Sequence, residues 1–225
     1  MATPYVTIVH DEVSSTQDTA AAALVEHAGA VLIVASRQTA GRGRFGNEWW
    51  QAPRGVAASV AFLEETPAVD PTFTLTMGLA VRAAIRSVVD LDVRLKWPND
   101  ITIPAGKVGG ILVQRTGDVI VAGCGLNLWW PEPPPGVAGL LARDPGPDLG
   151  LRLSQHWANS VLTGGQSWDR KAYKEACATL GEEVKWEPGG HGRAVDVDAA
   201  GRLVIETGHG LTSLWSGQVH TVRSA

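Results

Sequence analysis

The segment that most restricts what this chain can fold into is 36–46, with the sequence SRQTAGRGRFG. Its glycines and arginines suit neither a helix nor a core strand, because glycine weakens regular structure and arginine is rarely buried. The segment contains no acidic residue. Arginine donates to phosphate or carboxylate oxygens, and glycine lets a backbone approach a ligand closely. We therefore predict a mobile cationic loop that closes over an anion.

The size and charge of the chain limit the kinds of protein that it can be. Its 225 residues are 44% hydrophobic, which is enough for one large core with a small appendage. The net charge of −4 argues against general nucleic-acid binding, which requires a basic face. The N-terminus lacks the features of a signal peptide, and no apolar run has the length of a membrane span. We expect a cytoplasmic protein without a nucleic-acid or membrane partner.

The two cysteines, Cys124 and Cys177, lie far apart in the sequence. Neither belongs to a Cys-x-x-Cys motif or a Cys/His cluster, so the sequence gives no support for a bound structural metal. We expect two reduced, buried thiols.

Hydrophobic patterning predicts an α+β domain over 1–180, with strands and helices that alternate along the chain. The start of the first helix is marked by Ser15 and Thr16, with Asp18 placed as in a capping box. The expected strands are 6–9, 31–35, 55–63, 93–96, 107–115 and 119–128, and the expected helices are 16–27, 72–89, 151–162 and 168–180. The proline-rich stretch 131–147 is predicted to be an irregular connection.

After Gly181 the sequence changes to short alternating runs separated by turns that contain glycine or aspartate. The pattern predicts a small β-barrel over 181–225. About 45 residues form a poor independent core, so we expect this barrel to pack against the main domain.

Three further segments are candidates for chemistry. The first is 96–100, Lys-Trp-Pro-Asn-Asp, in which Pro-Asn-Asp favours a tight turn. The second is Lys107, followed closely by two glycines, and the third is 123–127, where small residues allow something to approach a sheet. Each also has a plain structural explanation as a turn, a solvated charge or a packing site.

In their order and spacing, these segments resemble the biotin protein ligases over nearly the whole chain. The combination of Gly-Arg-Gly-Arg-x-Gly with Lys-Trp-Pro-Asn-Asp is highly specific. The matching residues are Ser15, Thr16, Gln38, the 41–46 loop, Trp49, 96–100, Lys107, Gly110, 125–127 and the end of the C-terminal barrel at 222–224.

The resemblance implies a fold and an activity. The fold is a mixed sheet flanked by helices, like that of class II synthetases, followed by an SH3-like β-barrel. The activity is the joining of biotin to ATP, with Mg²⁺, to give biotinyl-5′-AMP and pyrophosphate. Biotin then passes to a lysine of a biotin carboxyl carrier domain of a carboxylase. The oligomeric state is not fixed, and a homodimer is kept open. The chain starts close to its first expected strand, so we expect no N-terminal winged-helix DNA-binding domain.

Biotin-binding roles follow from the same resemblance. Ser15, Thr16 and Gln38 bond the ureido ring, with help from the backbone of Arg42. Trp49 forms an apolar wall. The implied biotin-binding set is Ser15, Thr16, Gln38, Gly41, Arg42, Gly43, Trp49, Lys107 and Gly110.

Nucleotide and catalytic roles are implied in the same way. Lys107 contacts the biotin carboxylate and the α-phosphate, and Asp100 orients or deprotonates the acceptor amine. The implied nucleotide-binding set is Arg42, Arg44, Gly46, Trp49, Asn99, Asn127 and Arg223, and the implied catalytic residues are Lys107, Arg44 and Asp100. Asn99, Asp100 and Asn127 are assigned to the nucleotide and magnesium region, without a named metal ligand.

One residue departs from the family pattern, and three alternative functions stay open. Gln17 stands where the family often has asparagine, and its longer amide fits if it points away from the ureido ring. A lipoate or octanoate ligase has the same fold but needs no ureido donors, so Ser15 and Gln38 would lack a purpose. A non-catalytic biotin or adenylate sensor would not require an intact Lys107. A nucleic-acid-binding barrel would require more basic and aromatic residues in alternation.

Overall fold

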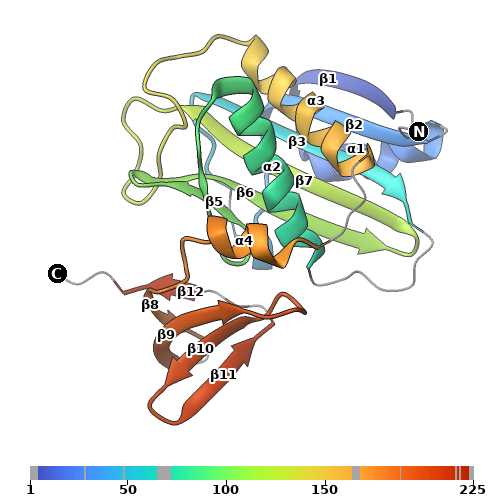
Figure 1. The fold of residues 1–225 in the computed structure, drawn as a ribbon. Coiled ribbons are helices and arrows are strands. Elements are labelled where there is room, and N and C mark those ends of the chain that lie inside the picture. The colour runs from blue at the N-terminus through green and yellow to red at the C-terminus, as the bar shows by residue number, and fades with distance from the viewer. Residues whose placement is uncertain are drawn as a thin grey trace.

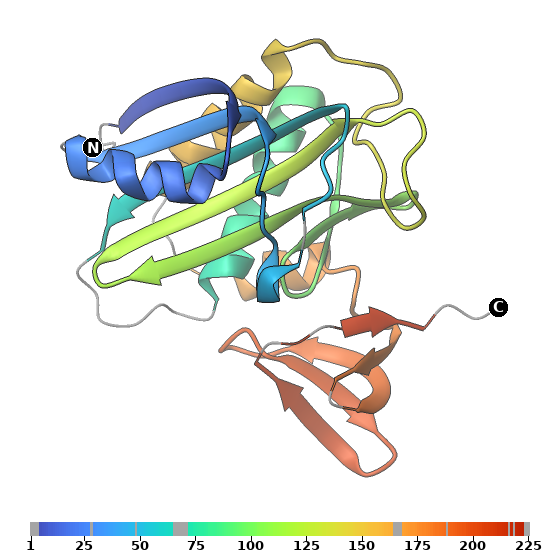
Figure 2. The ribbon, with the colours of Figure 1, turned by 180° about the vertical axis from the view of Figure 1, so that it is seen from behind.

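A computed structural model describes residues 5–27, 29–47, 49–64, 72–163, 168–187, 189–215, 217 and 219–222. The N-terminal part is a seven-stranded sheet with helices on both faces (Figures 1 and 2). The strand order is β1-β2-β3-β7-β6-β5-β4. Strands β1 and β2 are parallel and the other pairs are antiparallel, so the sheet is mixed, as expected.

The strands of this sheet lie where the sequence predicted them, but β1 and β2 extend to 13 and 38, beyond the predicted ends at 9 and 35, and β5 was not predicted. They are β1 Tyr5–Val13, β2 Ala30–Gln38, β3 Arg54–Leu63, β4 Arg94–Lys96, β5 Asp100–Ile103, β6 Gly106–Thr116 and β7 Val119–Trp129. The helices are α1 Thr16–Glu26, α2 Phe73–Val89, α3 Asp148–Thr163 and α4 Arg170–Ala176.

Helix α1 begins where the capping pattern placed it. Ser15 is the N-cap, and its hydroxyl accepts a hydrogen bond from the backbone N–H of Asp18. The helix joins β1 to its parallel neighbour β2, and it packs on β2 and β3. On this face α1 also reaches β7, where Val121 belongs to the apolar cluster of α1, whereas none of the described helices crosses the rest of β7 and β6 there (Figure 2).

Strand β2 is buried on both faces because its side chains alternate between two apolar clusters. Val31 and Ile33 pack with α1, whereas Leu32 and Val34 belong to the large core on the other face. Helices α2 and α3 cover that second face (Figure 1).

The helix predicted over 168–180 is shorter, because β4 competes for its end. Helix α4 stops at Ala176, and Cys177 then forms a parallel bridge with Leu95 of β4. The guanidinium of Arg94 donates to the carbonyls of Ala176 and Cys177, at 3.0 and 3.1 Å. These contacts replace the hydrogen bonds that a longer helix would make.

The C-terminal part is a five-stranded antiparallel sheet of order β11-β10-β9-β8-β12. Its strands are β8 Glu183–Trp186, β9 Gly190–Val197, β10 Leu203–Thr207, β11 Gly210–Leu214 and β12 Val219–Thr221. This arrangement is consistent with an SH3-like domain. Within the described residues, edge strands β11 and β12 do not pair with each other, so the sheet is open. The prediction of a closed barrel was therefore wrong.

The second sheet packs against the first part, as expected. Its buried residues, among them Val184 and Leu203, belong to the same apolar cluster as the main core. The indole of Trp97 donates to the carbonyl of Gly201 at 3.0 Å, and this bond connects the 96–100 turn to the second sheet. None of the described helices combines the length and apolarity needed to cross a bilayer.

Candidate functional site

A cavity of about 250 Å³ lies beside the start of α1, on the sheet face that this helix packs against. Its walls come from the start of α1, the segment after β2, the β4–β5 turn and strands β6 and β7. Strand β12 of the second sheet adds Val219 and His220. Figure 2 shows the segment after β2 crossing this face toward the second sheet. Elements far apart in the sequence therefore meet around one space.

One end of the cavity is neutral and rich in hydrogen-bonding groups. The backbone N–H and the hydroxyl of Thr16 both donate to Gln38 Oε1, at 2.8 and 3.0 Å. The hydroxyl of Ser59 donates to Thr16 Oγ1 at 2.8 Å from beneath. Because these bonds fix the Gln38 amide, its orientation is set before any ligand arrives. Ser15 lines the cavity beside them.

The floor of the cavity is made of glycine so that an indole can lie on it. Gly110 and Gly125 face each other across β6 and β7. A Cβ atom on Gly125 would lie 2.6 Å from the Trp49 ring, and one on Gly110 would lie 3.4 Å from it. Any larger residue at 125 would therefore displace Trp49, the residue predicted to form an apolar wall.

A bulge in β6 turns Lys107 toward the cavity. Asp100 pairs with Gly110, and Thr102 pairs with Lys107, so Val108 is an extra residue on β6. Simple alternation from Gly110 would place Lys107 on the opposite face of the sheet. The bulge restores it to the face of Asp100, and Lys107 Nζ lies 2.6 Å from Asp100 Oδ1. The ammonium group also lies 5.6 Å from the centre of the Trp49 ring.

The glycine–arginine loop supplies a second cation, Arg44, to the end of the cavity where Lys107 lies. Arg44 donates to Asn99 Oδ1 at 3.2 Å, which joins the loop to the 96–100 turn. Burial lowers the pKa of Arg44, and the charge of Asp100 opposes that shift. Asn99 is itself fixed, since its Nδ2 donates to the carbonyl of Ile111 at 3.1 Å. Phe45, at the loop tip, has a φ of 58° and packs against the Arg44 guanidinium.

Arg42 lies at the other side of the loop. Its guanidinium is 2.6 Å from Asp18 Oδ1, and both side chains are about half exposed. This ion pair ties the loop to the first turn of α1. Arg42 and Gly43 both line the cavity.

Most of the predicted site residues that the structure describes line this cavity, and three of the described ones do not. Gly41 packs beside Gln38 and Trp49, and Gly46 takes a φ of +76° in the open part of the loop. The Asn127 side chain is buried and accepts a hydrogen bond from the backbone N–H of Ala52 at 3.2 Å. Arg223 lies outside the described residues.

The structure adds residues for which the sequence analysis gave no role. Ser59 was hidden in an apolar strand, where a single hydroxyl among alanines and valines was the only signal. Gln17 is buried and lines the cavity, and its Nε2 donates to the carbonyl of Leu112 at 2.8 Å. Gly123 leaves the space that this amide occupies. His220 reaches the cavity from a strand distant in sequence, which no local pattern could indicate.

The charges around the cavity are mainly positive. Four cationic side chains line it within the described part of the chain: Arg42, Arg44, Lys96 and Lys107. The carboxylate of Asp100 is the single acidic group among the described lining residues. No group of three or more metal-ligating side chains occurs among the residues that the structure describes. This arrangement is suited to holding an anion next to a neutral polar group.

Comparison with known proteins agrees with this geometry. Residues 11–127 match the model of the Biotin/lipoate A/B protein ligase family. The biotin--[acetyl-CoA-carboxylase] ligase of Mycobacterium tuberculosis is 30% identical over 217 residues, which cover 86% of this chain and 79% of the relative. The bifunctional ligase/repressor BirA of Bacillus subtilis is 27% identical over 236 residues, which cover 94% and 73%.

A solved structure is similar along almost the whole chain. The biotin protein ligase from Aquifex aeolicus, in complex with biotin and ATP, has a TM-score of 0.77 and 27% identity, and the match covers 97% of this chain and 99% of that one. The family model, the relatives and the fold agree, and this chain belongs to the biotin/lipoate A/B protein ligase family.

Proposed function

We propose that this protein is an ATP-dependent biotin protein ligase. It activates biotin to biotinyl-5′-AMP and transfers biotin to a lysine of a biotin carboxyl carrier domain. One observation carries the proposal: a single cavity joins a neutral polar end, at Thr16 and Gln38, to a cationic end, at Lys107 and Arg44. Biotin has a neutral ureido head and a carboxylate tail. The similarity to the biotin ligases of Mycobacterium tuberculosis and Aquifex aeolicus supports the same activity.

The neutral end suits the ureido head. A buried urea must have its N–H and C=O groups satisfied, or binding loses free energy. The hydroxyls of Ser15 and Thr16 and the amide of Gln38 offer both donors and acceptors there. A lipoyl chain has no such groups, and these side chains would lose their partners around it.

The cationic end suits adenylation. A carboxylate oxygen of biotin attacks the α-phosphorus of ATP, the new C–O–P bond forms, and the P–O bond to pyrophosphate breaks. Both reactants are anions, so the attack requires neutralisation and alignment more than a protein nucleophile. Lys107 and Arg44 supply the positive charge, and Trp49 covers the glycine floor.

Transfer to the carrier requires a neutral amine. The acceptor lysine attacks the acyl carbon of the adenylate, the C–O bond to AMP breaks, and one proton leaves the nitrogen. Asp100 is the carboxylate available at the cavity wall, and we assign it the role of orienting or deprotonating this amine. Its neighbour Lys107 stabilises the charge on the departing phosphate.

Magnesium fits this donor set as a partner of ATP. Mg²⁺ prefers oxygen ligands and is usually held by substrate phosphates with one or two protein carboxylates. Asp100 and Asn99 offer side-chain oxygens beside the cationic end. When bound, the ion neutralises charge on the phosphates.

We also propose a division into a catalytic domain, 1–180, and a C-terminal domain, 181–225. Helix α4 ends at Ala176 and β8 begins at Glu183, which supports this boundary. We propose a cytoplasmic location, supported by two free, buried cysteines, Cys124 and Cys177. A homodimer stays a prediction.

Mass spectrometry of a carrier domain tests the proposed function. The domain is incubated with this protein, ATP, Mg²⁺ and biotin, with lipoate and octanoate in parallel samples. A gain of one biotin on the carrier, and no gain with the other acids, is the expected result. A gain with lipoate or octanoate alone would assign the chain to the lipoate branch. Biotin binding without transfer to the carrier would support a sensor instead.

A further inference from the structure

The hydroxyl group of Tyr173, on α4, is buried behind the proposed active site. The residue is 1% exposed, and its oxygen has no hydrogen-bond partner within the described protein. Burial raises the pKa of Tyr173 well above its usual value, with smaller contributions from Cys177 and Asp100. The phenol is therefore a neutral donor. A buried hydroxyl without a partner is unusual, because nearly all buried polar groups are satisfied by protein or by ordered water.

A small cavity adjoins this residue. The 96–100 turn contributes Asn99 and Asp100 to its wall, and α2 contributes apolar side chains such as Leu75. About 10 Å³ of it can be reached by the centre of a water molecule, which is room for about one water. Asn99 and Asp100 also line the large cavity, so their turn is the wall between the two spaces.

We propose that Tyr173 is a positioning residue for the ligase reaction, and that its hydroxyl donates to one buried water that in turn donates to the Asp100 carboxylate. The inference rests on the proposed function, since it concerns the same Asp100. The carboxylate would then be held from two sides: by Lys107 in the large cavity and by the water behind it. Lys107 would depend on Tyr173 for its own placement, because Asp100 Oδ1 is 2.6 Å from its ammonium.

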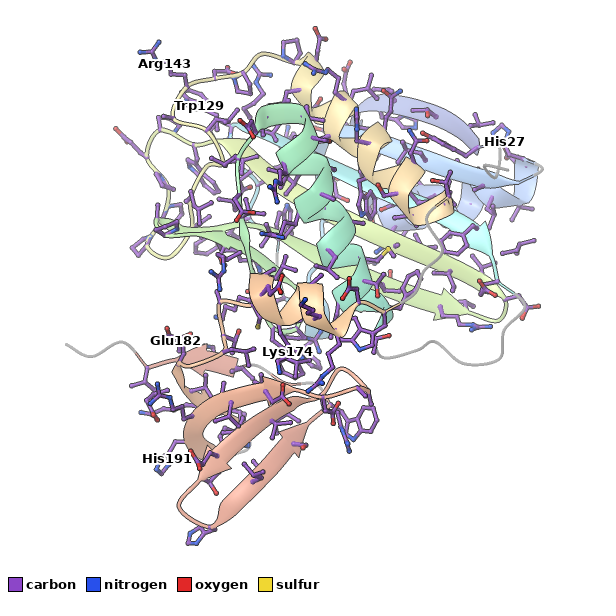
Figure 3. The ribbon with its side chains drawn as sticks, in the orientation of Figure 1. His27, Trp129, Arg143, Lys174, Glu182 and His191 are labelled. Carbon is purple, nitrogen blue, oxygen red and sulfur yellow. The ribbon has the colours of Figure 1, made fainter. Side chains whose placement is uncertain are left out.

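Helix α4 is fixed on two sides, and this holds Tyr173 in place beside the 96–100 turn. Toward the first sheet, Arg94 binds the carbonyls at the end of α4, directly before the 96–100 turn. Toward the second sheet, Arg170 and Lys174 reach Asp196 at 2.6 and 2.7 Å. Figure 3 shows Lys174 pointing from α4 toward that sheet. A short helix held in this way is suited to positioning a catalytic turn.

A purely structural reading makes the opposite predictions for one variant. If the Tyr173 hydroxyl were an unsatisfied group, Tyr173→Phe would remove a destabilising feature, so the melting temperature would rise and the kinetics would not change. If the hydroxyl holds Asp100 through water, the same variant loses a useful bond. It would then gain no thermal stability, and the catalytic step would slow.

The experiment compares wild type, Tyr173→Phe and Tyr5→Phe. Tyr5 is a matched control. It lies on β1, an edge strand of the sheet that contributes no residue to the cavity wall described above. Its hydroxyl donates to Asn159 Oδ1 at 3.0 Å. Pyrophosphate release gives kcat and the KM values for biotin and ATP. We expect kcat of Tyr173→Phe to fall about tenfold, with both KM values within about twofold, since misplacement of a reacting group affects the chemical step. Tyr5→Phe keeps the wild-type kcat.

Crystal structures of wild type and Tyr173→Phe provide a readout that does not depend on activity. The wild type should show one ordered water bonded to the Tyr173 hydroxyl and to Asp100, and the variant should lose it or show it displaced. A cavity without water in the wild type, or a variant with unchanged kcat and a raised melting temperature, would overturn the proposal. If wild type released no pyrophosphate with biotin, the proposed function would fail, and the two crystal structures would still decide whether Tyr173 holds Asp100.

Discussion

Lys107 Nζ lies 2.6 Å from Asp100 Oδ1, and the two residues come from strands that the 104–105 turn connects. Without a ligand, the central cation of the site is therefore already paired. A biotin carboxylate that binds here competes with Asp100 for the ammonium. Because both side chains are only partly exposed, at 35% and 22%, the competition takes place with limited screening by water.

Lys107→Ala should leave the fold intact and reduce adenylate formation by about 10²- to 10³-fold, the usual loss when one preorganised transition-state donor is removed. Pyrophosphate release at saturating biotin and ATP measures the effect. Lys171→Ala, an exposed residue of α4, is the matched control and should keep wild-type activity. Release by Lys107→Ala at the wild-type rate would refute the assignment.

Gly125→Ala should weaken biotin binding more than Gly110→Ala does. The added methyl group at 125 would lie 2.6 Å from the Trp49 ring, whereas the one at 110 would lie 3.4 Å away and meet ordinary contact. Overpacking of this kind costs about 1–3 kcal/mol, so the affinity for biotin should fall by about 5- to 150-fold for Gly125→Ala. Calorimetric titration compares the two variants. Equal affinities would show that Trp49 does not rest on this floor when biotin is bound.

Much of the fold was predictable because its signals are local. The cap of α1 and the apolar run of β2 depend on neighbouring residues only, and the structure places both where the sequence did. Strand β5 was missed because turn-forming residues directly precede it. The end of α4 was misplaced because β4, far away in sequence, takes its backbone groups: Arg94 donates to the carbonyl of Ala176, and the carbonyl of Leu95 accepts from the N–H of Ala178.

The site was predictable in its residues and not in its geometry. Motif spacing named Lys107 and Asp100, but the bulge at Val108 that turns Lys107 toward the cavity depends on pairing with β5. Ser59 and Tyr173 carry no motif, and only packing brings the first under Thr16 and the second behind the 96–100 turn.

Arg44→Gly should release the adenylate too early. Arg44 joins the loop to Asn99, and a hydrogen bond to a charged group contributes about 1.5–3 kcal/mol, so release should be about 10- to 100-fold faster. Free biotinyl-5′-AMP acylates exposed lysines, and a bystander protein in the reaction should therefore become biotinylated. Arg37→Gly, which removes an exposed arginine paired with Glu12, should not label the bystander. An unlabelled bystander with Arg44→Gly would exclude the loop as a lid.

Asn127→Ala should reduce the stability of the protein and leave nucleotide binding unchanged. The buried Asn127 amide accepts from the backbone N–H of Ala52, and its loss leaves that donor unsatisfied at a cost of about 1–3 kcal/mol. Urea unfolding measures the change. Asn159→Ala, at an exposed hydrogen bond, should change the free energy of unfolding by less than about 0.5 kcal/mol. A stable Asn127→Ala protein with a raised KM for ATP would instead favour direct nucleotide contact.

The contact between α4 and the second sheet should weaken in acid. Burial raises the pKa of Asp196, but hydrogen bonds and charges from Lys174, Val197 N–H and Arg170 outweigh it and leave the pKa lowered. A carboxylate with a lowered folded-state pKa stabilises the protein above the ordinary value of about 3.9, and this contribution disappears as the pH falls through the folded-state pKa. Wild type should therefore exceed Asp196→Asn in urea midpoint at pH 6, with a difference that shrinks toward pH 3. Asp11→Asn, at an exposed position of β1, should match wild type at pH 6. A difference between wild type and Asp196→Asn that stayed constant with pH would show that the carboxylate charge does not hold α4 to the second sheet.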